Sequence, residues 1–592
     1  MENQRNLLLA VVLCGLLLVG WEAGMNYFYP QPEKPVQSEA TVQSDNAAPA
    51  PAGSPANIDA PAAAAAQPVD LNEALTAPER IKIDSPEVLG TINNVGARID
   101  DITLKTHRET VDKDSGPVRI FSPEGTATQQ FAQFGWIGEG VAVPDAETVW
   151  QTEGSALAPD TPVTLRYDNG EGQLFTIELS IDNHYMITAK QTVANTGTES
   201  GGGPIVVRPY SFINRTDRNA AEGMINVHSG PIGNFDESVQ FGPDYDDLAE
   251  SASEGRTEGR AAWLGFTDIY WMSVLIPEDG SDAQTEFRSL GNQIFRADMI
   301  YQPVTVGAGK QVTRTTQLFA GAKESAILNE YEAAGVNLFG NAIDWGWFAI
   351  IAKPIWWLLT HLFGWVGNFG LAIIGLTVLI RLVLFPIAQK QFASMAAMKA
   401  IQPKMKAIQE RYKDDKQEQQ KKIMELYKKE KVNPLAGCLP ILIQIPIFFA
   451  LYKTLILAIE MRHQPFALWL KDLSAPDPAH VLNLFGLLPF EVPGLLAIGP
   501  LAILLGVTMW LTFRMNPTAM DPIQKQIFAI MPWMLMFVMA PFAAGLLLYW
   551  VTNNILTLAQ QTYLYSRHPQ LRAAAEKEKA DKAAAAAREA KG

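Results

Sequence analysis

Residues 367–395 read GNFGLAIIGLTVLIRLVLFPIAQKQFASM, and this stretch decides the fold class. Its first part is apolar and has about the 20 residues that a membrane-spanning helix needs. Arg381 is the only charge before residue 390. An unpaired charge at the centre of a bilayer costs about 2.5–3.5 kcal/mol on insertion scales. Arg381 is therefore expected either to face a hydrated recess or to extend its side chain to the nearer membrane surface.

Composition places the chain among integral membrane proteins. Its 592 residues exceed one ordinary domain, 48% of them are hydrophobic, and only 18% are charged. Residues 31–340 hold 20 Lys and Arg against 44 Asp and Glu, whereas residues 341–592 hold 26 against 16. This asymmetry indicates opposite sides of a membrane, with the basic part in the cytoplasm. Cys14 and Cys438 lie in or beside apolar runs, so neither a disulfide nor a metal site is indicated.

The first 30 residues are expected to form a retained membrane anchor with a cytoplasmic N-terminus. An apolar run at 7–20 follows Arg5, which is also how a secretory signal peptide begins. Aromatic residues follow this run where a cleavage site would have small ones, and aromatic residues favour the membrane interface. Residues 31–74, which include PAPAGSPANIDAPAAAAAQP, are rich in Pro and Ala and are predicted to be a flexible linker.

Residues 75–340 are predicted to form a β-sandwich domain. The clearest segment is Val163–Val193, in which three β-prone runs are separated by turn signals at Asn169-Gly170 and Asp182-Asn183. The histidines of this part are scattered, and its acidic residues are interpreted as a solvated surface. No catalytic constellation is found, so the domain gives no sign of an enzyme.

Six membrane spans are predicted, five of them in a C-terminal core. The segments after the β-sandwich are an interfacial helix region at 341–366 with its helix at Ala342–Lys353, the second span at 367–388, a polar segment at 389–434, four more spans within 435–565, and a basic tail at 566–592. The basic segments all fall on one side of the membrane, so both termini are expected in the cytoplasm and the acidic domain outside it.

The polar segment 389–434 is expected to be a cytoplasmic hairpin of two amphipathic helices. It holds 12 Lys and Arg against 6 Asp and Glu, and apolar residues recur at helical spacing in both halves. One interpretation is a charged loop packed on its own apolar faces. The other adds a methionine-rich surface that adapts to varied apolar partners.

Several polar residues share the predicted spans with Arg381. Thr377 lies one turn before it, and others lie in further spans: Gln444, Thr508, Thr552, Asn553, Asn554, Gln560 and Gln561. Each alone is usually a contact between helices, whereas together they could line a recess open to the cytoplasm. No Asp or Glu lies in the spans near Arg381, which argues against a proton relay or an ion-coupled carrier.

Three long segments and the start of the chain resemble one known family. The segments are IQPKMKAIQERYKDDKQ at 401–417, VNPLAGCLPILIQIPIFFALYKTL at 432–455 and PFALWLKDLSAPDP at 465–478, and the start is QRNLL at 4–8. They closely resemble the bacterial YidC membrane-protein insertases, which are related to mitochondrial and chloroplast insertases. The resemblance covers nearly the whole chain.

The resemblance implies a groove open to cytoplasm and lipid, with an arginine that matches Arg381 and a threonine that matches Thr377. The paired aromatic motif of the last span is Tyr549-Trp550 here, with Trp550 where the family has tyrosine. The expected substrate-binding groove is lined by Arg381, Thr377, Gln444, Tyr549, Trp550 and Asn554.

The resemblance further implies a supersandwich-like periplasmic domain in a protein of the bacterial inner membrane. The implied partners are nascent membrane proteins, the Sec translocon with its accessory subunits, the ribosome and membrane lipids. No cofactor, metal, catalytic residue or nucleic-acid substrate is expected.

Two other classes of function predict features that the sequence does not show. A secondary transporter predicts internal repeats around a site in the middle of the membrane, and no such symmetry is visible in the sequence. An enzyme of the cell envelope predicts a cluster of acid, base or metal-binding residues in the β-domain, and none is found.

Overall fold

The computed structural model describes residues 68–567, apart from 77–79, 113, 198–202, 217–226, 251–256, 258–259, 279–281, 347–348, 414, 431–438, 486–487, 489–491, 493–496 and 516–521. The expected anchor at 1–30, most of the linker and the tail at 566–592, except its first two residues, lie outside the described residues. Within the expected linker, Leu71–Ala74 is a short helix, α2, which Asp70 caps by accepting hydrogen bonds from two backbone N–H groups.

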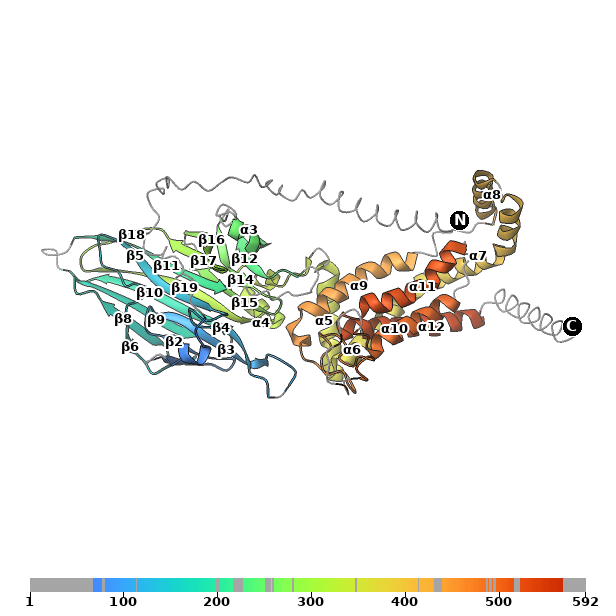
Figure 1. Cartoon of the computed structure of the whole chain (residues 1–592). Coiled ribbons are helices and arrows are strands. Elements are labelled where there is room, and N and C mark those ends of the chain that lie inside the picture. Colours follow the sequence, from blue (N-terminus) through green and yellow to red (C-terminus); the bar gives the residue numbers. More distant parts are fainter. Residues whose placement is uncertain are drawn as a thin grey trace, which may run out of the picture.

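The N-terminal part is a sandwich of two large sheets (Figure 1). The ten-stranded sheet comprises β16 (Ala283–Gly291), β17 (Ile294–Tyr301), β11 (Ile205–Thr216), β5 (Gln130–Glu139), β3 (Arg98–Arg108), β2 (Val88–Asn93), β1 (Ile81–Asp84) and β7 (Ala156–Leu157) in that order, with β18 (Val304–Val306) beside β11 and β4 (Pro117–Phe121) beside β3. The nine-stranded sheet comprises β13 (Ser238–Phe241), β12 (Gly230–Phe235), β14 (Ala261–Thr267), β15 (Trp271–Pro277), β19 (Lys310–Ala322), β10 (Met186–Asn195), β9 (Gln173–Ile181), β8 (Val163–Asp168) and β6 (Gln151–Glu153) in that order.

The three strands predicted within Val163–Val193 are present as the antiparallel meander β8–β9–β10. Their turns lie at the two predicted positions, where Gly170 adopts a positive φ of 73°. Strand β9 alternates buried and half-buried side chains along its whole length, which is the period of two that places Phe175 and Ile177 in the core. The β-rich domain expected from the sequence is therefore confirmed.

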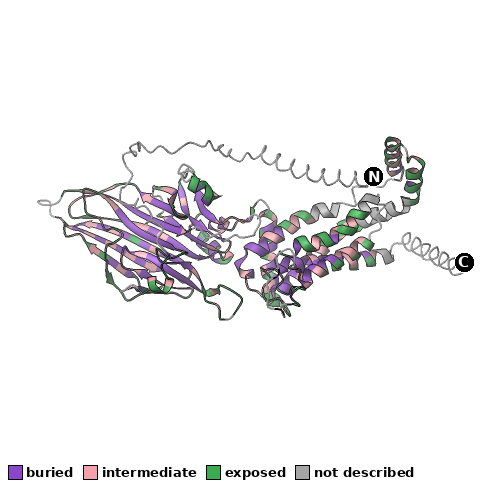
Figure 2. Cartoon of the chain, in the orientation of Figure 1, coloured by how far each residue is buried: buried purple, intermediate pink, exposed green. Residues whose placement is uncertain are grey.

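The C-terminal part is helical (Figure 1). Its elements are η1 (Phe339–Ala342), α5 (Ala349–Val366), α6 (Phe369–Val383), α7 (Phe385–Arg411), α8 (Lys416–Lys429), α9 (Leu439–Leu457), η4 (Ile459–Met461), α10 (Pro500–Met515), α11 (Pro522–Met539) and α12 (Ala544–Arg567), and the β-domain adds α3 (Tyr245–Glu250) and α4 (Ser325–Ala333). Helix α12 packs against α6, α9 and α10, and it is therefore the central helix of this part. Figure 2 shows buried residues throughout the sheets and many exposed or half-buried ones along the outer helices.

Among the described helices, α5 alone is long and apolar enough to cross a membrane by itself. Helices α6 and α10 and parts of α9 and α11 are apolar but shorter. The count of six spans therefore stays a prediction. The helix expected at Ala342–Lys353 begins at Ala349 instead and continues to Val366, because residues 339–342 form the separate 3-10 turn η1.

Helices α7 and α8 form the expected hairpin. Ile401 and Met405 on α7 and Leu426 on α8 are buried, and the two helices meet where the Tyr427 hydroxyl lies 3.3 Å from the sulfur of Met405. Met424 is 59% exposed on the opposite face of α8. The hairpin thus packs on its own apolar residues, as the first interpretation expects, while one methionine faces outward.

Candidate functional site

Arg381 lies in the last turn of α6 and is bonded to the central helix α12. Its Nε donates to Oδ1 of Asn553 at 2.8 Å, and its Nη2 donates to the backbone oxygen of Asn553 at 3.2 Å. Nη2 also donates to the hydroxyl of Thr557. These bonds direct the side chain into the helical bundle, which argues against the alternative in which Arg381 extends along its own helix to the membrane surface.

The three acceptors of Arg381 are all neutral oxygens. Hydrogen bonds from a charged donor contribute about 1.5–3 kcal/mol each when one partner is removed. They satisfy the N–H groups of Nε and Nη2 without cancelling the charge. No carboxylate among the described residues pairs with Arg381, so this part of the apolar bundle keeps a net positive charge, which attracts an incoming acidic or polar group.

Helix α12 supplies polar residues on two neighbouring faces. Tyr549, Asn553 and Thr557 are spaced by four residues, so they lie on one face of the helix. The Tyr549 hydroxyl, which is almost fully buried, accepts a hydrogen bond from Nε2 of Gln444 on α9. On the next face, Asn554 donates to the Thr508 hydroxyl of α10 at 3.1 Å. Side-chain hydrogen bonds thus join α12 to three other helices, α6, α9 and α10.

Two expected site residues make no polar contact of this kind. The hydroxyl of Thr377 is fully buried and donates to the backbone oxygen of Ile373 at 2.7 Å, within its own helix. Trp550 packs against Phe448 of α9 with ring centres 5.1 Å apart. Thr377 therefore contacts its own helix and Trp550 contacts α9, and neither of these contacts is with Arg381.

Thr557 is a partner of Arg381 that the sequence analysis did not name, and Asn553 was named only as a polar residue of the spans and not as part of the expected groove. Asn553 adjoins Asn554 in the sequence, so its polarity was visible but its partner was not. The available signal was the spacing of four from Tyr549 to Asn553 and Thr557, which places both on the face of a residue that the family resemblance had marked.

A pocket of about 310 Å³ lies beside Arg381, between α6 and α12. Its walls are mostly apolar and are formed by Val378, Arg381, Leu382, Phe385, Leu556, Ala559, Gln560 and Tyr563. The amide nitrogen of Gln560 is buried and has no hydrogen-bond partner among the described residues. The pocket thus combines apolar walls with one cation at its edge.

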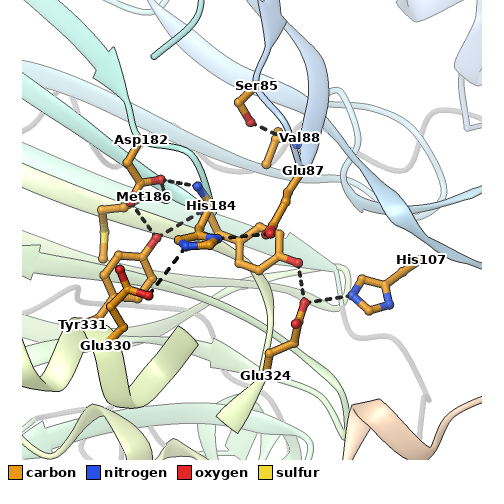
Figure 3. Close-up of polar contacts among 11 residues, drawn as sticks. Ser85, Glu87, Val88, His107, Asp182, His184, Met186, Glu324, Glu330 and Tyr331 are labelled. Carbon is orange, nitrogen blue, oxygen red and sulfur yellow. Dashed lines mark hydrogen bonds and ion pairs between the residues drawn. The ribbon is translucent and has the colours of Figure 1, made fainter. Parts of the chain in front are cut away.

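The β-domain contains a second polar cluster, around helix α4 (Figure 3). Nδ1 of His184 lies 3.1 Å from Glu87, and its Nε2 lies 3.7 Å from Glu330 of α4. Burial alone would lower the pKa of His184, but Glu87, Asp182 and Glu330 outweigh it and raise that pKa. The hydroxyl of Tyr331 donates to Asp182 at 2.7 Å and fastens the same helix to the turn after β9.

The other half of this cluster is centred on Glu324, which precedes α4. Its Oε1 accepts a hydrogen bond of 2.7 Å from the Tyr185 hydroxyl and lies 3.1 Å from Nε2 of His107 (Figure 3). Burial raises the pKa of Glu324, but the bonds from His107 and Tyr185 outweigh it, so the net pKa is lowered. The histidines that look scattered in the sequence therefore include two that serve to hold α4.

Helix α4 also connects the two parts of the molecule. Ser325 donates through its N–H and its hydroxyl to Glu460 of η4, at 3.1 and 3.0 Å, and the indole of Trp356 on α5 donates to the same hydroxyl at 3.1 Å. Arg462 donates to the backbone oxygens of Arg108 and Glu109 at 2.6 and 2.8 Å. The sheets and the helices therefore meet through a built interface.

Comparisons with known proteins agree with this architecture. Residues 361–571 match the family described as 60Kd inner membrane protein, and residues 80–358 match the YidC periplasmic domain. The membrane protein insertase YidC of Zymomonas mobilis is 44% identical over 570 residues, which cover 96% of either chain. That of Bradyrhizobium diazoefficiens is 42% identical and covers 96% of this chain and 97% of its own.

A solved structure of an active YidC insertase with its first transmembrane domain is 18% identical, with a TM-score of 0.36, and covers 83% of this chain and 93% of that one. The identity to the two sequence relatives extends over 96% of this chain and so includes both the sheets and the helices. The chain belongs to the YidC family of membrane-protein insertases of the bacterial inner membrane, with residues 80–358 as its periplasmic domain.

Proposed function

We propose that the chain inserts nascent membrane proteins by receiving a hydrophilic segment of the client beside Arg381. The observation that carries this proposal is the set of neutral partners on α12, which hold the guanidinium inside the bundle and leave its charge uncompensated. No covalent step is involved. The recess shortens the apolar path that the hydrophilic segment crosses.

The driving force is the partition of the client's apolar segment into lipid along the outer faces of the helices. Burying a CH₂ group contributes about 0.8 kcal/mol, so about 20 apolar residues supply far more free energy than a short polar tail costs. The protein therefore needs only to lower the barrier for the tail. A positively charged, partly apolar pocket next to α12 provides this for tails that are acidic or uncharged.

The proposed topology has six spans, five of them in the insertase core. The sandwich of β1–β19 lies in the periplasm, whereas the α7–α8 hairpin and both termini lie in the cytoplasm. The basic hairpin is then placed to contact the ribosome, and the core is proposed to act both alone and with the Sec translocon and its accessory subunits. The excess of Lys and Arg in the α7–α8 hairpin is what supports the cytoplasmic assignment of the hairpin.

Site-specific crosslinking tests the proposed client path. A photoreactive amino acid at Leu382, which lines the pocket and is 62% exposed, should crosslink to a client stalled on a translating ribosome. Leu371 is the matched control, because it is 49% exposed on the same helix but outside the pocket. Equal crosslinking from both positions would show general contact with the helix surface and would contradict a path beside Arg381.

A further inference from the structure

The segment between η4 and α10 carries large apolar residues at its turns. Leu468 has a φ of 58° and is 90% exposed. Leu484 and Phe485 have φ values of 51° and 61° and are 52% and 58% exposed. The left-handed region is unfavourable for residues with a bulky side chain, and in water such turns usually carry Gly or Asn. Both turns therefore combine backbone strain with exposed apolar surface.

The first of these turns, which we call the Leu468 tip, is fixed over the start of α6. It is closed by bonds from the N–H of Phe466 to the oxygen of Leu470, at 3.0 Å, and from that of Leu470 to Ala467, at 3.1 Å. The side-chain amide of Asn368, the N-cap of α6, donates to the oxygen of Phe466 at 3.0 Å.

The second turn, the Phe485 tip, is fixed beside the start of α10. The N–H of Phe485 donates to the oxygen of His480 at 2.7 Å, and that of Val481 donates to Ile498 at 3.0 Å. Asp477, which adjoins this turn, accepts a bond of 3.1 Å from the N–H of Leu501 in the first turn of α10. Val481, Leu482 and Leu488 add further exposed apolar surface, with 38%, 52% and 40% of each exposed.

Both tips continue the exposed apolar surface of the helices they adjoin. Near the Leu468 tip, Trp365 at the end of α5 is 82% exposed and Leu371 in the first turn of α6 is 49% exposed. Near the Phe485 tip, Leu504 in the first turns of α10 is 45% exposed. These helix ends lie on the side of the bundle that meets the β-domain, because Arg462 of the same segment bonds to β3 and the residue after it.

We propose that the Leu468 and Phe485 tips are seated in the periplasmic leaflet of the membrane and contact phospholipid acyl chains near the headgroups. Burial in lipid removes the apolar side chains from water and so offsets the strain of the left-handed turns. Two rigid tips at the starts of α6 and α10 would also set the depth of both helices in the bilayer. Short apolar helices such as α6 depend on such anchors, because mismatch with the bilayer is otherwise met by tilting or thinning.

Depth-dependent fluorescence quenching tests this proposal on the full-length protein. Cys14 and Cys438 are replaced by Ser, and a single Cys at 468, at 485 or at the control position 149 carries a polarity-sensitive dye. Val149 is the control because it is apolar and 62% exposed but belongs to the β-domain. In vesicles of phosphatidylethanolamine and phosphatidylglycerol, nitroxide-bearing lipids should quench the dye at 468 and 485, and aqueous iodide should quench it at 149.

Iodide quenching at 468 and 485 equal to that at 149 would overturn the proposal. If those two positions became protected only after translocon or client was added, the tips would be protein-binding surfaces, which would overturn it as well. The variants Leu468→Asn and Phe485→Asn separate folding from lipid contact, because Asn tolerates the left-handed turn. Relative to the unsubstituted protein, both variants should melt at the same or a higher temperature in detergent and at a lower temperature in vesicles. An equal change of melting temperature in detergent and in vesicles would contradict the seating of the tips in lipid.

Discussion

Among single residues, Arg381 has a fixed position, and its positive charge is not neutralised by the partners that hold it. Asn553 and Thr557 orient the guanidinium, and Gln444 and Tyr549 brace the neighbouring turn of α12. A carboxylate in the place of Asn553 would orient the arginine equally well but would neutralise it. The choice of neutral partners is therefore what makes the site suited to attract a polar client segment.

Gly370 tests the packing that supports this site. A Cβ atom built at Gly370 would lie 2.0 Å from the ring of Phe466, so Gly370→Ala forces α6 and the loop between η4 and α10 apart. We expect a loss of about 1–3 kcal/mol in stability, which is the usual cost of overpacking. Gly364→Ala is the matched control, because nothing lies within 4 Å of its Cβ position and helix propensity alone should stabilise it slightly.

Thermal unfolding in detergent, followed by circular dichroism, distinguishes the two glycine variants. The Gly370→Ala protein should melt several degrees below the parent, whereas Gly364→Ala should melt at the same temperature or slightly above it. A parent-like melting temperature for Gly370→Ala would show that Phe466 moves aside freely. The loop would then not be fixed on α6.

At the scale of elements, α4 is the part whose attachment responds to pH. His184 reaches Glu87 in the turn between β1 and β2, Asp182 in the turn after β9, and Glu330 on α4, and these three carboxylates raise its pKa. A raised folded-state pKa gives stability that is fully present below the unfolded value of about 6.5 and is lost as pH rises through the folded pKa. We expect the attachment of α4 through His184 to weaken as the pH rises above about 6.5.

The comparison with His184→Gln measures this contribution. Burial lowers the pKa of His228, so His228 makes stability change with pH in the direction opposite to His184. The pH profile of the parent protein alone therefore does not isolate the contribution of His184. The difference in melting temperature between the parent and His184→Gln should be largest at about pH 6 and should shrink with rising pH. A difference that is constant across this range would assign His184 a packing role only.

The elements differ in how far the sequence predicts them. Alternation of apolar and polar residues locates β8, β9 and β10, because a strand's buried face is a local property. The same reasoning cannot predict the cluster around His184, because the partners of His184 lie in β-turns and in α4, far apart in the chain. Likewise, helical spacing shows which face of α12 is polar, but not that α6 rather than α9 lies opposite Asn553. The start of α5 was misplaced because Trp and Ile near Ala342 resemble a continuous helix, whereas the chain turns at η1.

At the scale of the whole molecule, the sheets and the helices are joined mainly at α4 and Arg462. The sequence suggests that the β-domain is separable, since it has a flexible linker on one side and no reactive cluster. The structure adds that Ser325 bonds to Glu460 and that Trp356 bonds to Ser325, so the boundary of a harmless deletion lies before α4.

We expect a protein lacking residues 75–322 but keeping α4 onward to insert clients at close to the normal rate. A deletion that extends through residue 334 removes Ser325 and leaves the half-buried carboxylate of Glu460 without this partner, and it should be less stable and less active. Insertion rates are compared at equal amounts of each protein in the membrane. Loss of insertion in the shorter deletion would show that the sandwich itself acts on clients.

The charge of Arg381 is proposed to receive the hydrophilic segment of a client, and an insertion assay in which the charge of one client's translocated tail is varied tests this role. At about 4 Å, a charge pair at an effective dielectric of about 20 is worth about 4 kcal/mol before desolvation is subtracted. A net effect of about 1–2 kcal/mol, or roughly ten-fold in rate, is therefore expected.

Arg381→Lys keeps the charge and should reduce the insertion rate only slightly. Arg381→Ala should slow the insertion of clients with acidic tails roughly ten-fold and that of clients with neutral tails much less. Arg381→Glu should slow the insertion of acidic-tailed clients further. Asn553→Ala is the accompanying control, since it loosens the position of Arg381 but keeps the charge. Equal slowing of acidic and neutral tails by Arg381→Ala would contradict the account and would leave helix packing as the role of this arginine.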